Sequence, residues 1–104
     1  MDHRLKKDKQ FSYIYKKGLR KSTRFLTLFK TESKFKCYKI GFSVSKKIGK
    51  ANVRNKVKRR MKEIVRINCL PSNYNNYVLM AREGVQNLTF ADLEKEIKEI
   101  FNKW

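Results

Sequence analysis

Hydrophobic residues recur at helical spacing in three segments of the chain. The first is residues 8–17, where Asp8 is the expected N-cap and Gly18 the expected left-handed stop. The second is residues 51–69. The third follows the expected N-cap Thr89. Its apolar stripe consists of Phe90, Leu93, Ile97, Ile100, Phe101 and Trp104.

Shorter segments alternate between hydrophobic and polar residues, which predicts β-strands. They are residues 25–29, 38–45 and 77–82, and the polar, basic segment 18–24 is expected to be a connector or a short edge strand. Along the chain the order is helix, three strands, helix, strand, helix (αβββαβα). This order predicts an α+β fold in which three helices pack on one face of a mostly antiparallel four-stranded sheet.

The segment 38–45 has two different faces. One face is expected to join the core and carries Ile40, Phe42 and Val44. The other is small and polar and carries Gly41, Ser43 and Ser45. Small side chains allow the backbone of a ligand to approach the sheet closely.

The charge of the chain is strongly positive and unevenly distributed. The 104 residues carry a net charge of +18, and residues 1–66 hold 23 of the 27 basic residues but only four of the nine acidic ones. Self-repulsion of this size destabilises a compact chain unless a polyanion neutralises it. The length suits one domain, so we expect a single RNA-binding domain over residues 1–104.

The predicted helix 51–69 separates its apolar residues from its basic ones. A helical wheel places Val53, Val57, Ile64 and Ile67 in a core-facing arc. Arg54 and Lys58 flank this arc, and the opposite face carries Asn55, Arg59, Lys62 and Arg66. A solvated charged face is the alternative, but like charges four residues apart destabilise a helix.

Lysines before this helix add positive charge at an end that already attracts anions. We therefore predict an RNA-binding surface in the helix and its preceding loop. Its residues are Lys46, Lys47, Lys50, Arg54, Asn55, Lys56, Lys58, Arg59 and Lys62.

Four aromatic residues provide a second candidate surface. Phe11 and Tyr15 share one face of a predicted helix, and Phe25 and Phe29 share one face of a predicted strand. Core packing would explain them equally well. If the helix lies beside the strand, the rings could instead line a groove and stack on unpaired bases, at about 1–3 kcal/mol per base.

The sequence contains few residues of the kinds used for catalysis or metal binding. Cys37 and Cys69 are expected to be reduced core thiols, and His3 lies in a charged terminus. No catalytic constellation, metal-ligand cluster, membrane-length apolar run or signal peptide is recognisable. We therefore expect a cytoplasmic RNA-binding protein with no catalytic or metal-binding residues and with neither membrane nor DNA as a partner.

One family carries a matching signature. The segment 41–49, followed by Ala51, Val53-Arg54-Asn55 and Lys58-Arg59, resembles the signature of the bacterial ribonuclease P protein subunit. The resemblance extends to Phe11-x-x-x-Tyr15-Lys16-x-Gly18, to Arg24 and to the segment 77–82. It covers about residues 5–104.

The resemblance implies an α-β sandwich with a left-handed βαβ crossover. It also implies that the protein binds a large catalytic RNA and that together they remove the 5′ leader of precursor tRNA. The RNA would carry the chemistry, with Mg²⁺ bound mainly by the RNA. The leader groove would contain Phe11, Tyr15 and Phe29, with Ser43, Ser45 and Lys46 nearby.

Three positions depart from the family pattern. Lys56 and Lys62 stand where arginine is common, which keeps the charge but loses the planar fork that binds phosphate in a bidentate manner. Phe29 stands where a tyrosine can occur, so a hydroxyl hydrogen bond is lost. The alternative to this family is a small ribosomal-type or general RNA-binding protein, which composition alone would also fit.

Overall fold

The computed structural model describes residues 8–34, 36–72 and 74–103, except for the side chain of Asp8. The elements in chain order are α1 (Asp8–Lys17), β1 (Leu19–Ser22), β2 (Leu26–Glu32), β3 (Lys39–Val44), the 3₁₀ turn η1 (Lys46–Ile48), α2 (Ala51–Asn68), β4 (Asn75–Ala81), the 3₁₀ turn η2 (Val85–Asn87) and α3 (Phe90–Phe101). This order confirms the predicted αβββαβα arrangement. The segment 18–24 contains a short edge strand, which was one of the two structures predicted for it, the other being a connector.

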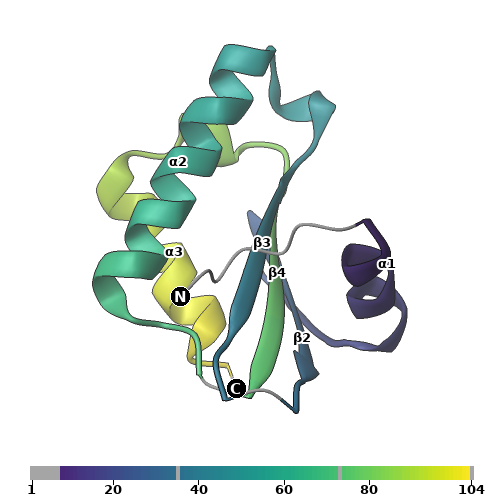
Figure 1. Cartoon of the computed structure of the whole chain (residues 1–104). Coiled ribbons are helices and arrows are strands. Elements are labelled where there is room, and N and C mark those ends of the chain that lie inside the picture. The colour runs from purple at the N-terminus through teal and green to yellow at the C-terminus, as the bar shows by residue number, and fades with distance from the viewer. Residues whose placement is uncertain (1–7, 35, 73, 104) are drawn as a thin grey trace.

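The four strands form one mixed sheet in the order β1-β2-β4-β3. β2 pairs antiparallel with both β1 and β4, whereas β3 pairs parallel with β4, so the sheet is mostly but not purely antiparallel. In Figure 1 the chain rises along β3 in front, returns through α2 and rises again along β4 behind. This crossover is left-handed, the rare sense for a βαβ unit.

The helices cover both faces of the sheet, and the expectation that they share one face is wrong. α2 and α3 lie on one side of the sheet and α1 lies on the other (Figure 1). The amphipathic pattern of α1 specifies that one side of the helix is buried. It does not specify which face of the sheet covers that side.

The main core fills the space between the sheet and the pair α2 and α3. From α2 it receives Val57, Met61, Ile64 and Val65. Each apolar side chain of this size stabilises the fold by about 1.5–3 kcal/mol when fully buried. The expected core position of Ile67 is wrong, because this side chain is 49% exposed. Val57 and Met61 lie near the centre of the buried arc, Val65 lies at one edge, and Ile67 falls beyond the other edge.

A second, smaller core lies under α1. It consists of Ile14, Phe29 and Val78, with Phe11 and Met80 packed against it. Phe29 and Val78 are paired neighbours on β2 and β4, so α1 rests across two central strands. This small core fixes the position of the N-terminal helix.

The end of α1 is held close to β2 by Gly18. Gly18 does not have a positive φ, so the predicted left-handed conformation is wrong. Its N–H donates to the carbonyl oxygen of Ile14 at 2.8 Å. A Cβ atom at this position would lie 2.5 Å from that oxygen and 3.1 Å from the carbonyl oxygen of Lys30. The close approach of the helix to the strand therefore requires glycine.

The start of α3 tests one of the two capping predictions. The Thr89 hydroxyl accepts a hydrogen bond from the N–H of Asp92 at 3.1 Å, which confirms this N-cap. The side chain of Asp8, which was predicted to cap α1, is outside the described part of the structure. His3 and Trp104, the predicted end of the apolar stripe, are also outside it.

The cysteines are less buried than predicted. Cys69 is exposed and adopts a left-handed conformation, φ 49°, at the end of α2. Cys37 is half-buried, so the prediction of core thiols is wrong for Cys69. Within the described ranges, no helix has the length and apolar character needed to cross a membrane.

Candidate nucleic-acid interface

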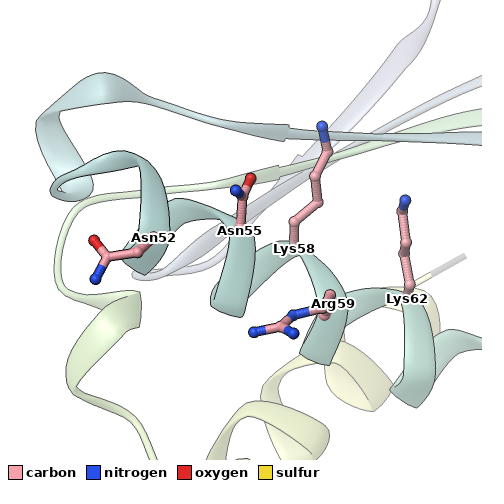
Figure 2. A pocket seen from close by; sticks show the side chains of 5 residues that line it. All are labelled: Asn52, Asn55, Lys58, Arg59 and Lys62. Atoms are coloured by element: carbon pink, nitrogen blue, oxygen red, sulfur yellow. The ribbon is translucent and has the colours of Figure 1, made fainter.

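The exposed side of α2 carries a continuous polar and basic surface, which we call the basic face. Its residues line a hollow of about 440 Å³ and are Asn52, Asn55, Lys58, Arg59 and Lys62. Figure 2 shows Asn55, Lys58 and Lys62 projecting in one direction from the helix, whereas Asn52 and Arg59 point toward its N-terminal end. These side chains suit a phosphate backbone lying along the helix. Asn52 was not predicted, although it lies one helical turn before Asn55.

Arg54 lies at the border between the basic face and the core. Its side chain is half-buried, and its Nε is buried without a hydrogen-bond partner among the described residues. A buried donor without a partner costs about 1–3 kcal/mol. An anionic acceptor that reaches the edge of α2 would satisfy this N–H.

The segment before α2 adds exposed cations. Lys46 and Lys47 lie in η1, Lys50 is the N-cap residue of α2, and all three are exposed. The Ser45 hydroxyl accepts a hydrogen bond from the N–H of Lys47 at 3.2 Å, so Ser45 shapes the turn that presents these lysines. Their position beside the N-terminus of an 18-residue helix favours anions.

Two other cations of α2 lie apart from the basic face. Lys56 is exposed but does not line the hollow, because it lies two residues from Lys58 and points in another direction. Arg66 is engaged by Glu63 through hydrogen bonds from Nε and Nη2. These bonds lower the pKa of Glu63, so the pair contributes stability near neutral pH that is lost as the pH falls through that lowered pKa.

Burial affects one further titratable group. The pKa of Tyr38 is raised chiefly by burial and secondarily by the nearby thiol of Cys69. Tyr38 packs against the main core, which is consistent with this burial. It belongs to the fold and not to the interface.

Three of the four predicted aromatic residues come together on the α1 side of the sheet. The rings of Phe11 and Tyr15 have centroids 6.5 Å apart, and those of Tyr15 and Phe29 meet edge to face at 4.9 Å and 78°. Phe29 is only 8% exposed, whereas Tyr15 is 37% exposed. Phe29 therefore supports the Tyr15 ring from below, and the surface available for stacking comes from Tyr15 and Phe11.

Phe25 does not join this group, and its predicted position is wrong. It precedes β2 and packs against the main core on the other side. Its ring approaches Gly84, where an added Cβ would lie 3.1 Å away, and the guanidinium of Arg24 lies 5.3 Å from the ring centroid. Strand alternation failed here because the strand begins only at Leu26.

The sheet beside α1 presents a row of small and flexible side chains. Ser43 on β3 is in register with Met80 on β4, and Met80 is in register with Thr27 on β2. Ser43 and Met80 are half-buried, and Met80 also packs against the small core under α1. We call Phe11, Tyr15, Ser43 and Met80 the aromatic face. The alternation of β4 could have revealed Met80, which lies two residues after Val78.

We searched the described residues for a cluster of metal-binding side chains. They contain no group of three or more His, Cys, Asp or Glu side chains placed to hold a metal ion. The chemistry available at the two faces consists of cations, amides, hydroxyls and rings. These groups bind polyanions and stack on bases.

Comparison with known proteins identifies relatives over the whole chain. The family model "Ribonuclease P" matches residues 1–104. A ribonuclease P protein component of Clostridioides difficile is 37% identical over 101 residues, which cover 95% of this chain and 89% of that protein. That of Clostridium botulinum is 33% identical over 104 residues, covering 98% and 94%. The structure of the RNase P protein of Staphylococcus aureus superposes with a TM-score of 0.92 at 27% identity, covering 99% of this chain and 95% of that one.

Proposed function

Since the chain belongs to the ribonuclease P protein family, we propose that it is the protein subunit of a ribonucleoprotein endoribonuclease that removes the 5′ leader of precursor tRNA. The catalytic RNA is its partner and carries the hydrolysis. The protein supplies two binding surfaces, one for the catalytic RNA and one for the leader. It acts in the cytoplasm.

The basic face and the lysines before α2 would contact the catalytic RNA and the phosphates near the cleavage point. The support for this assignment is a helix surface with five polar or basic residues around one hollow and no acidic residue among them. Lys56 would contribute through its charge, from a different side of the helix. The single observation that carries the assignment is this continuous cationic surface on a folded helix.

The aromatic face would hold the leader as an extended single strand. Tyr15 and Phe11 offer ring surface for unpaired bases, and Ser43 with its small side chain lets a backbone approach the sheet. Ser45 would act through the turn that it caps. Phe29 would hold the Tyr15 ring in place, and Phe25 is left out because of its position.

Mg²⁺ would be bound mainly by RNA. The described residues offer no carboxylate cluster for it, and an excess of positive charge on the protein disfavours a divalent cation. The protein's own contribution would be to screen phosphates so that the two RNAs approach each other. When bound by the RNA, the ion would activate water and stabilise the charge that develops at the scissile phosphate.

The experiment that tests this proposal adds the protein to the catalytic RNA at low Mg²⁺ and measures release of the 5′ leader from precursor tRNA. We expect the protein to accelerate leader release when Mg²⁺ alone is too dilute to screen the RNA. A ribosomal-type or general RNA binder would give no acceleration. Competition with unrelated RNA distinguishes specific assembly from general binding.

Replacing Arg54 with alanine should weaken binding to the catalytic RNA and reduce its salt dependence. One phosphate contact contributes about 0.7–0.9 to the slope of log K against log salt, and Arg54→Ala should lower the slope by about that amount. Binding is measured by filter retention at several salt concentrations.

The double variant Glu63→Ala, Arg66→Ala is the matched control, because it alters the same helix without changing the net charge. It should keep the wild-type slope. An unchanged slope for Arg54→Ala would remove Arg54 from the interface.

A further inference from the structure

A second hollow lies on the side of α1 that faces away from the aromatic face. It has a volume of about 360 Å³ and is bordered by the C-terminal half of α1, the start of β1, the end of β2 and the start of β4. Its lining residues are Tyr13, Lys17, Leu19, Lys30, Thr31, Glu32 and Asn75. The proposed leader site uses none of them.

The hollow exposes apolar surface that the fold does not use. Tyr13 is 60% exposed and Leu19 is 65% exposed. Tyr13 and Tyr15 lie two residues apart on α1, which corresponds to about 200° around the helix, so their rings face opposite ways. Tyr15 packs on Phe29, whereas Tyr13 borders the hollow.

The hollow is held by backbone contacts. Lys17 and Leu19 flank Gly18, whose close approach to Ile14 and Lys30 fixes the corner between α1 and β2. Leu19 and Lys30 are also paired in register across β1 and β2. The ring, the apolar side chain and the lysines are therefore presented together by a rigid corner of the fold.

The charges around the hollow favour an anionic occupant. Two of its lining residues are lysines and one is acidic, and Lys16, Arg20 and Lys21 are exposed on the same two elements. Lys16 and Lys17 also stabilise the C-terminus of α1, which accounts for their presence but not for the exposed ring beside them. The volume is at the lower end of the range of about 300–1,000 Å³ for small-ligand sites, which suits one base with its sugar.

We propose that this hollow is a second contact for single-stranded RNA, in which Tyr13 stacks on one base while Lys17 and Lys30 face the adjoining phosphates. This second contact rests on the proposed function in one respect, which is that RNA is the polyanion that the protein binds. It gives the N-terminal helix two RNA-binding sides, separated by the small core beneath it.

The test follows backbone amide signals of the full-length, ¹⁵N-labelled protein during titration with a single-stranded hexanucleotide. We expect two groups of shifted amides, one around Tyr15 and Ser43 and another around Tyr13, Lys17 and Thr31. Tyr13→Ala should weaken RNA binding reported by the second group of amides about five- to tenfold and leave the first group unchanged, because an exposed ring gives the weaker end of the effect of stacking on one base. Tyr13→Phe should behave as wild type.

Alanine is compatible with the helix at this exposed position, so Tyr13→Ala should fold. The proposal is overturned if the amides around the hollow do not shift, or if Tyr13→Ala leaves their titration unchanged. It is also overturned if Tyr13→Ala alters only self-association in sedimentation, which would assign the hollow to a second copy of the chain. If amides shift only around Tyr15 and Ser43, the second contact is overturned and the proposed leader site is unaffected. If no amides shift around Tyr15 and Ser43, the result counts against the proposed leader site.

Discussion

Replacing Phe11 and Tyr15 together with alanine is expected to remove most of the protein's preference for precursor tRNA over mature tRNA. The exposed Tyr15 ring and the half-buried Phe11 ring supply the accessible ring surface of the aromatic face. Each base that loses its stacking partner loses about 1–3 kcal/mol of binding. Affinity for precursor tRNA should therefore fall by one to several powers of ten, while affinity for mature tRNA changes little. The measurement is equilibrium binding of both tRNAs to the assembled ribonucleoprotein.

Two controls separate loss of stacking from loss of folding. Tyr15→Phe keeps the ring and should keep the preference, because the edge-to-face contact with Phe29 needs no hydroxyl. Thermal unfolding of the double variant shows how far the half-buried Phe11 contributes to the small core. Equal losses for precursor and mature tRNA in a folded double variant would contradict the leader assignment.

The second large effect concerns stability. Gly18→Ala should reduce the free energy of unfolding by about 1–3 kcal/mol, the usual cost of forcing extra volume into a packed site. The added Cβ would lie 2.5 Å from the Ile14 carbonyl oxygen and 3.1 Å from that of Lys30, and backbone atoms cannot move away as a flexible side chain can. Urea denaturation measures the loss.

A suitable control is Ser12→Ala, an exposed change on the same helix that should cost little. If Gly18→Ala unfolded at the wild-type urea concentration, the corner between α1 and β2 would be looser than the contacts indicate. The variant should also weaken the proposed RNA contacts on both sides of α1, because the helix would shift on the sheet.

The element order could be read from the sequence because each element carries a clear local signal. Period-two alternation in the segment 38–45 and helical spacing from Val53 to Ile64 do not depend on distant contacts. The Thr89 cap is a local signal as well, and the structure confirms it. The family resemblance supplied the handedness of the crossover, which general statistics would have given the opposite sense.

The positions that could not be predicted depend on where elements begin and on what covers them. Phe25 was assigned by strand alternation to the wrong side because β2 starts one residue later. Ile67 lies near the end of α2, where its side chain has passed beyond the sheet-facing arc. The position of α1 on the opposite face of the sheet is a tertiary property that its own sequence does not encode.

In the candidate site, too, some features follow from local sequence signals and others depend on tertiary packing. Asn55, Lys58, Arg59 and Lys62 were predicted from a helical wheel, and the structure places them around one hollow. The partial burial of Arg54 and the supporting position of Phe29 required the packed structure. Both change the expected roles, since Arg54 has a donor to satisfy and Phe29 has little surface left for stacking.

We propose that the protein recognises the leader of precursor tRNA. The most direct measurement compares the affinities of the catalytic RNA for precursor and mature tRNA, with and without the protein, at one fixed salt concentration. We expect the protein to raise the affinity for precursor tRNA selectively, and we expect this selectivity to disappear when the leader is removed completely. An equal increase for both tRNAs would contradict this proposal.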